Sequence, residues 1–219
     1  IPLHIIPPIP RAPFFVFPNK SIKSTRLFFS VKAIFTAIIA GIIGLILGII
    51  LTVTERDGIL ENKIVNTLLD KIINLFRSIP FIILLAILAP LTRVIVGTRI
   101  GEKAAIVPLV FGTFPFFARQ VQNVLLEVDS GVVEAAEAMG SSEIEIITRV
   151  YLKESLPSLI RVCAITLISL IGLSAMAGAI GAGGLGKLAI AQGYNRFQDD
   201  VTLVSMFIIL IIVYIIQGI

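Results

Sequence analysis

Charged residues divide this chain into long apolar segments separated by short polar ones. No charged residue occurs in residues 33–54, 162–186 or 201–219, and two further runs, 72–92 and 104–126, contain one arginine each. A helix needs about 20 mostly apolar residues to cross a bilayer. The runs are continuously apolar rather than alternating, which argues against strands. The pattern therefore predicts an all-α polytopic membrane protein with about five transmembrane helices.

The composition agrees with this pattern. Of 219 residues, 57% are hydrophobic and 15% are charged, and the mean hydropathy is +1.02. Because a soluble domain carries about 25% charged residues, a soluble enzyme, a disordered chain and a large soluble catalytic domain are excluded. One cysteine, Cys163, cannot form an internal disulfide, and one histidine, His4, argues against a metal site. The net charge of +4 fits basic loops near lipid headgroups rather than nucleic-acid binding.

Residues 1–32 differ from the rest, which we expect to form one transmembrane domain over residues 33–219. Prolines and aromatic residues gather up to Pro18, so we expect an irregular or interfacial arm. Glycines inside the first and fourth runs either mark faces where helices approach closely or reflect the frequency of glycine in membrane helices. They are Gly41, Gly44, Gly48, Gly172 and Gly178.

Five helices place the two termini on opposite sides, and the charges do not decide which side is cytoplasmic. The side that holds the 127–161 loop has eight basic residues, whereas the other side has five, or ten when the N-terminal arm is counted. Arg77 and Arg119 lie near the loop-side ends of their runs. We favour the interpretation that they snorkel to the membrane surface, although either can line a pathway.

The loop 127–161 is the one long polar stretch, and it predicts two short helices. The first places Val132, Ala136 and Met139 on one face, and Gly140 is suited to end it in a left-handed conformation. Ser142 and Glu145 have the spacing of a capping box that starts the second helix, which places Ile144, Ile147 and Tyr151 on one face. Helices this short need a partner for stability. The acidic residues of the loop favour a protein over an anionic membrane surface.

Glu134-Ala135-Ala136, followed after three residues by Gly140, resembles the EAA motif of permease subunits of bacterial ABC importers. The family pattern continues with an I-x-L-P sequence, where this chain has Val150-Tyr151-Leu152-Lys153, with Leu156-Pro157 one turn later. Four further segments are similar to the D-/L-methionine branch of these permeases. They are residues 76–81 (FRSIPF), 92–98 (TRVIVGT), 104–109 (AAIVPL) and 181–186 (GAGGLG).

The resemblance implies a type I ABC importer permease fold that acts as a homodimer in the bacterial cytoplasmic (inner) membrane. It also implies that the EAA loop and the C-terminus are cytoplasmic. The partners implied are a second copy of the chain, two cytoplasmic ATPase subunits that bind ATP and Mg, an extracytoplasmic methionine-binding lipoprotein and membrane lipid. The chain itself is then a non-catalytic subunit with no cofactor, which forms the pathway for D- and/or L-methionine. The residues expected to couple it to the ATPase are Glu134, Ala135, Ala136, Gly140, Ser142, Glu145, Leu156 and Pro157.

Residues 181–187 also match phosphate-loop patterns, G-x-G-x-x-G and G-x-x-x-x-G-K. We reject nucleotide binding, because a membrane helix rather than a strand precedes them and Leu188 stands where such a loop needs Ser or Thr. The glycines are expected instead to break the helix at the outer face and to form part of a gate. The gate or pathway candidates are Met176, Gly181, Gly183, Gly184, Gly186 and Arg77.

Two alternatives remain open from the sequence. The first is a permease for another small amino acid or solute. The second is an ATP-independent carrier or channel. All 14 acidic residues lie outside the predicted spans, which argues against a proton- or sodium-coupled carrier, because such proteins keep an ionisable group in the membrane.

Overall fold

The structure is a computed structural model that describes residues 19–179 and 181–218, and none of these residues lies in a strand. The longer helices are α1 (Asn19–Val53), α2 (Lys63–Ser78), α5 (Ile106–Leu125), α9 (Leu156–Ala179) and α11 (Asp199–Gln217). The shorter ones are α3 (Phe81–Ile87), α4 (Ala89–Val96), α6 (Ser130–Ala138), α7 (Glu143–Glu145), η1 (Ile146–Tyr151), α8 (Leu152–Glu154), α10 (Gly184–Lys187), η2 (Leu188–Gly193) and η3 (Tyr194–Arg196). The predicted all-α class is confirmed for the described residues.

Helix α1 begins at Asn19, well before the predicted start at residue 33. The expectation of an irregular arm is therefore wrong for residues 19–32, and residues 1–18 lie outside the described part of the chain. The physical reason is that Pro18 is the last proline before residue 53, so nothing after it removes a helical hydrogen bond.

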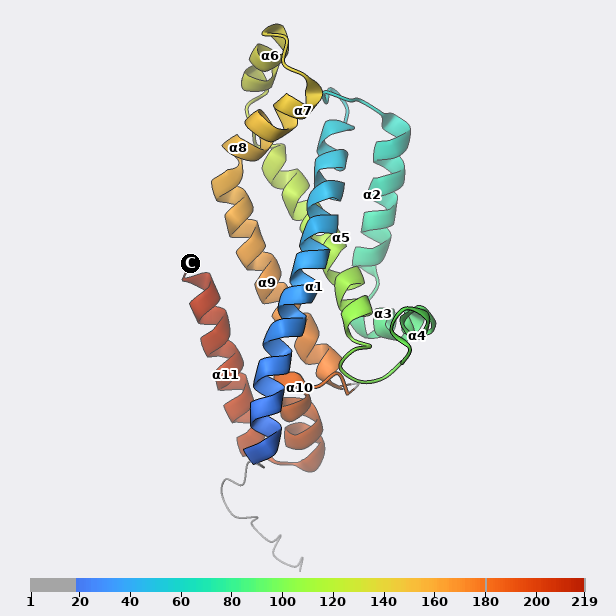
Figure 1. Cartoon of the computed structure of the whole chain (residues 1–219), viewed down its shortest axis with the longest axis vertical. Helices are drawn as coiled ribbons and strands as arrows, with labels where there is room; N and C mark the ends of the chain where they lie inside the picture. The colour runs from blue at the N-terminus through green and yellow to red at the C-terminus, as the bar shows by residue number, and fades with distance from the viewer. Residues whose placement is uncertain (1–18, 180, 219) are drawn as a thin grey trace, which may run out of the picture.

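The bundle is built around the contact between α1 and α5, and Figure 1 shows α1 running along the molecule with α5 and α9 beside it. Two glycines allow this contact. A Cβ atom added to Gly44 would lie 2.9 Å from the Phe114 carbonyl oxygen, and one added to Gly48 would lie 2.6 Å from Val121 Cβ. The interpretation of these two glycines as a close-packing face is confirmed. It is wrong for Gly41 and Gly172, which have no atom within 4 Å of an added Cβ.

The predicted span 72–92 is not one helix. Helix α2 starts at Lys63, where the Asn62 side chain accepts hydrogen bonds from the backbone N–H groups of Ile64 and Val65, at 3.2 and 3.1 Å. It stops before Pro80, which lacks a backbone donor. Figure 1 shows the short helices α3 and α4 turned aside from the direction of α2.

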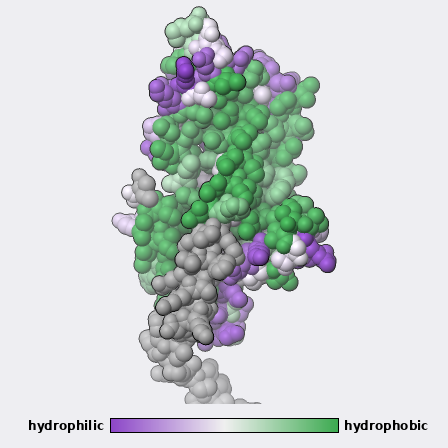
Figure 2. All heavy atoms as spheres, in the orientation of Figure 1, coloured by the Kyte–Doolittle hydropathy of each residue, from purple (hydrophilic) through white to green (hydrophobic). Residues whose placement is uncertain are grey.

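Within the described part of the chain, three helical stretches are long and apolar enough to cross a membrane: Ile34–Val53, Leu156–Gly178 and Asp199–Gln217. Many of their large apolar side chains are exposed, as Ile38, Ile42 and Leu210 illustrate, and this suits contact with lipid or with another helix. Figure 2 shows hydrophobic residues over the middle of one face and hydrophilic residues at the end formed by α6, α7 and α8. The count of five spans stays a prediction, since α5 and the helices α2 to α4 do not meet the same requirement of helix length and apolar composition.

The two glycines in α1 give a matched test of the α1–α5 contact. In Gly48→Leu the new side chain meets Val121 and the Ala118 carbonyl, and overpacking of this kind costs about 1–3 kcal/mol or more. We expect a lower thermal unfolding midpoint and less monodisperse protein in size-exclusion chromatography. Gly41→Leu, which adds the same side chain where no atom lies within 4 Å, should behave as the unmodified chain. Equal effects of the two variants would contradict the assigned contact.

Candidate functional site

The candidate site is the polar connection between α5 and α9, residues 127–155, which we call the connecting segment. It forms the hydrophilic end of the molecule (Figure 2). Helix α6 is capped at its start by Asp129, whose carboxylate accepts a hydrogen bond from the Gly131 N–H at 2.7 Å. The helix ends at Gly140, whose φ of +80° lies in the left-handed region that favours glycine.

The turn after α6 satisfies the last carbonyls of the helix. The Gly140 N–H donates to the Glu137 carbonyl at 2.9 Å, and the Ser141 N–H donates to the Ala136 carbonyl at 3.1 Å. This pair of hydrogen bonds is a Schellman motif. The predicted left-handed helix end at Gly140 is therefore confirmed.

The predicted capping box at Ser142 is also present and starts α7. The Glu145 carboxylate accepts hydrogen bonds from the Ser142 backbone N–H at 3.2 Å and from the Ser142 hydroxyl at 3.1 Å, and it lies 3.5 Å from Arg149. These contacts hold the pKa of Glu145 below its usual value, the backbone hydrogen bond most, then the hydroxyl and then the arginine.

The two faces predicted for the short helices are partly exposed and partly buried. Val133, Ala136 and Ile146 form the buried contact between them, whereas Met139 is 79% exposed and Ile144 is 73% exposed. The sequence reasoning missed two features that determine this buried contact. Ile59, from the connection between α1 and α2, packs on this cluster. The chain from Ile146 to Tyr151 also forms a wider π-helical turn, which shifts the register away from 3.6 residues per turn.

The exposed side of the connecting segment combines apolar and acidic side chains. Val132, Met139 and Ile144 are exposed there, and so are Glu134, Ala135 and Glu143. Exposed apolar groups rimmed by charged ones are typical of a surface that binds another protein. Tyr151 lies on the inner side, where burial, and then the negative charge of Glu137, raise its pKa.

Helix α8 continues through Lys153, where the family pattern has proline, and α9 begins immediately afterwards at Leu156 with Pro157 in its first turn. A proline in the first turn leaves the hydrogen bonds of the helix intact. The connecting segment therefore passes into α9 without a flexible linker.

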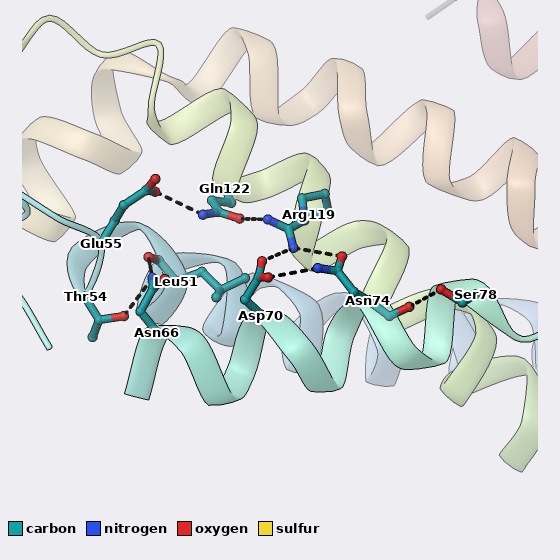
Figure 3. Close-up of polar contacts among 9 residues, drawn as sticks. All are labelled: Leu51, Thr54, Glu55, Asn66, Asp70, Asn74, Ser78, Arg119 and Gln122. Carbon is teal, nitrogen blue, oxygen red and sulfur yellow. Dashed lines mark hydrogen bonds and ion pairs between the residues drawn. The ribbon is translucent and has the colours of Figure 1, made fainter. Parts of the chain in front are cut away.

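A polar network links α5 to α1 and α2 beneath the connecting segment (Figure 3). The Arg119 guanidinium forms an ion pair with Asp70 and donates to Asn74 Oδ1 at 3.1 Å and to Gln122 Oε1 at 2.7 Å. The Gln122 amide donates to Glu55 Oε2 at 3.1 Å. Asp70 lies outside the predicted span 72–92, as expected, but it lies within α2, which extends the helix back to Lys63. The sequence signal was the set of polar residues spaced four apart on α2: Asn66, Asp70, Asn74 and Ser78.

The network answers part of the question about the two arginines in the predicted spans. Arg119 neither snorkels freely nor stands alone, because Asp70 pairs with it. Arg77 is exposed in the last turn of α2, and its role in a gate stays a prediction.

The glycine segment after α9 forms a tight reversal. Gly181, Gly183 and Gly184 have φ values of +89°, +82° and +74°. Gly186 packs against Ala175 so closely that an added Cβ would lie 2.2 Å from the Ala175 carbonyl oxygen. Gly178 approaches the Lys187 backbone in the same way, at 2.4 Å. The predicted break in the helix is confirmed, and the interpretation of Gly178 as a close-packing residue is confirmed as well.

The contacts of Gly178 and Gly186 pack this turn closely against α9. Met176 is 49% exposed on α9, so the structure does not bring it into the contact made by Gly178 and Gly186. The role of Met176 and of the glycines as a gate stays a prediction.

The fold and the site define a class: a membrane protein that is all-helical over its described residues and carries a structured polar segment at one end of its apolar helices. The chain belongs to the family of binding-protein-dependent transport system inner membrane components, whose sequence pattern matches residues 42–219. The resemblance to importer permeases is confirmed.

Individual relatives agree with the family. The probable D-methionine transport system permease protein MetI of Vibrio cholerae is 43% identical over 170 residues, which cover 78% of this chain and 76% of that protein. The methionine import system permease protein MetP of Bacillus subtilis is 47% identical over 168 residues, or 77% and 76% of the two chains. A chain of the MetNI methionine ABC transporter in an inward-facing conformation superposes with a TM-score of 0.89 at 42% identity, covering 93% of this chain and 95% of that one.

The pKa of Glu145 gives a pH-dependent test of the capping box. A carboxylate whose pKa is lowered in the folded state stabilises that state above its unfolded value of 4.5, and this stabilisation is lost as the pH falls through the lower folded value. We expect the backbone amides of residues 142–148 to lose protection in hydrogen exchange as the pH drops below 4.5. In Glu145→Gln the protection should be weaker at neutral pH and nearly independent of pH. The matched control, Glu143→Gln, should keep the pH dependence, and its loss there would contradict the assignment to Glu145.

Proposed function

We propose that this chain is the permease subunit of an ATP-driven importer and forms the translocation pathway for methionine across the cytoplasmic membrane. The observation that carries the proposal is the connecting segment, which presents the EAA-type sequence on two capped helices at the polar end of the fold. The substrate comes from the relatives, whose names specify methionine or D-methionine transport.

In this proposal two copies of the chain pair about a two-fold axis, and the connecting segment of each copy binds a separate cytoplasmic ATPase subunit that holds ATP and Mg. The exposed Met139 and Ile144 enter a groove of the ATPase, and the surrounding glutamates contact its polar rim. An extracytoplasmic lipoprotein delivers methionine. ATP binding closes the ATPase dimer and shifts the helices from an inward-facing to an outward-facing arrangement.

The connecting segment suits transmission of a movement, because it is held at both ends and from the side. The Schellman motif and the capping box fix the angle between α6 and α7. The buried cluster of Val133, Ala136 and Ile146 ties both helices to Ile59. A displacement of the segment is therefore carried into α5 and α9 rather than absorbed by a loose loop.

The function is tested by co-purification and uptake. We expect the ATPase subunit to co-purify with the unmodified chain and with Tyr194→Asp, and to be lost in Met139→Asp. Met139 and Tyr194 are similarly exposed, at 79% and 72%, but only Met139 lies on the connecting segment. Proteoliposomes that contain the complete transporter should take up labelled methionine only when ATP is supplied. Uptake without ATP or without the ATPase subunit would contradict the proposal, and uptake of another amino acid alone would reject the substrate.

Gly140 offers a sharper test of the connecting segment, because its surroundings are open and only its backbone conformation is special. A β-branched residue in a left-handed conformation costs about 1–2 kcal/mol. We expect Gly140→Val to distort the turn and to lower ATP-driven uptake by about tenfold, which is within the usual range of coupling free energies. Gly140→Asn should keep most of the uptake, since asparagine tolerates this conformation. Normal ATPase association together with normal uptake in Gly140→Val would show that the turn is not part of the coupling.

A further inference from the structure

The polar network of Figure 3 links α2, α5 and the turn that follows α1. Arg119 contacts Asp70 and Asn74 on α2 with one nitrogen and Gln122 on its own helix with the other. Gln122 then reaches Glu55 at the end of α1. We call Glu55, Asp70, Asn74, Arg119 and Gln122 the polar clamp.

The clamp lies where α5 passes into the connecting segment. Arg119 and Gln122 occupy the last two turns of α5, which ends at Leu125, and α6 follows from Ser130. A displacement of the connecting segment therefore reaches the clamp through continuous backbone. The clamp residues of α2, Asp70 and Asn74, lie in the middle of that helix.

Helix α2 is held on one side only. Ile73 is fully buried in a cluster with Leu51 and Ala118, whereas Ile64 and Leu75 on the other side are 80% and 61% exposed. Apolar contacts alone permit sliding between helices in a membrane, because lipid is as apolar as the side chains. The directional contacts of the clamp therefore fix the position of α2 on α5.

The charges make this connection costly to break. The Arg119 and Asp70 side chains are 19% and 39% exposed, and the Arg119 Nε atom is buried without a hydrogen-bond partner. Removing either charge leaves the other partly buried and uncompensated. The clamp thus favours one arrangement of α2 and α5 rather than a range of intermediate ones.

We propose that Arg119 is a positioning residue of the transport cycle, through which α2 follows α5 when the connecting segment moves. The inference rests on the proposed function, since it assigns a role within ATP-coupled transport. Arg119 acts through Asp70 and Asn74 and contacts neither ATP nor substrate. Loss of the clamp therefore separates ATP hydrolysis from uptake without stopping hydrolysis.

The test measures methionine uptake per ATP hydrolysed in proteoliposomes that contain the complete transporter. In Asp70→Asn and Arg119→Gln we expect this ratio to fall about fivefold or more, with ATP hydrolysis changed by less than about twofold. The exchange variant Asp70→Arg/Arg119→Asp should recover part of the ratio, because the ion pair is restored with reversed polarity. The control Lys71→Gln, which alters an exposed charge on α2, should match the unmodified transporter.

Two results for Asp70→Asn and Arg119→Gln would overturn the proposal. In one, uptake and hydrolysis fall in the same proportion, as they do when the fold is merely damaged. In the other, the single variants keep the ratio of Lys71→Gln. Arg119→Lys is a milder variant, to be used if Asp70→Asn or Arg119→Gln folds poorly. It keeps the positive charge but lacks the branched guanidinium that reaches Asp70, Asn74 and Gln122 together. Its ratio should lie between those of the unmodified chain and Arg119→Gln, and an unchanged ratio would overturn the proposal.

A spectroscopic measurement separates failure of the clamp from failure of the proposed function. Spin labels at Leu75 on α2 and Asn123 on α5, both exposed, report the distance between the helices in a Cys163→Ala background. We expect a narrow distance distribution that broadens or shifts in Asp70→Asn, whether or not the chain transports methionine. An unchanged distribution would overturn the clamp. A transporter without ATP-driven uptake but with the expected broadening would overturn the proposed function alone.

Discussion

The close contact between α1 and α5 is the interaction on which the other helix contacts depend. Lipid chains are as apolar as leucine, so helices in a bilayer associate through close packing and polar contacts rather than through exclusion of water. Gly44 and Gly48 provide that packing by bringing the α1 backbone against Phe114, Ala118 and Val121. With α1 fixed on one side, α5 can contact α2, α3 and α9 on its others. The central place of α5 follows from two residues that lack side chains.

The same helix connects the membrane part of the fold to its polar end. The last turns of α5 carry Arg119 and Gln122, and the connecting segment begins directly afterwards. The segment then returns through α8 into α9, which also packs on α5. The polar end is therefore joined to two helices that contact each other, α5 and α9. A force applied to the polar end acts on both helices together.

The sequence predicted correctly those features that depend on interactions between residues close together in the chain. The helix end at Gly140 and the capping box of Ser142 and Glu145 depend on a few consecutive residues, and both were predicted correctly. The start of α2 was not predicted correctly, because charge spacing locates uncharged runs, whereas Asn62 starts a helix whose first two turns contain Lys63 and Asp70. The buried contact of Val133, Ala136 and Ile146 within the connecting segment was not predicted either, since it depends on the distant Ile59 and on the π-helical turn.

The pairing of Arg119 with Asp70 required the tertiary structure, and it bears on the source of energy. A carrier driven by protons needs an acid in the membrane that gains and loses its proton during transport. Among the described residues of α1, α2, α5 and α9, Asp70 is the one acid, whereas Asp199 and Asp200 stand in the first turn of α11. The Asp70 carboxylate is held by Arg119 and by Asn74, which donates at 2.9 Å. Asp70 is thereby engaged as a structural contact between α2 and α5, and this supports the proposal that the energy for transport arrives from a separate subunit.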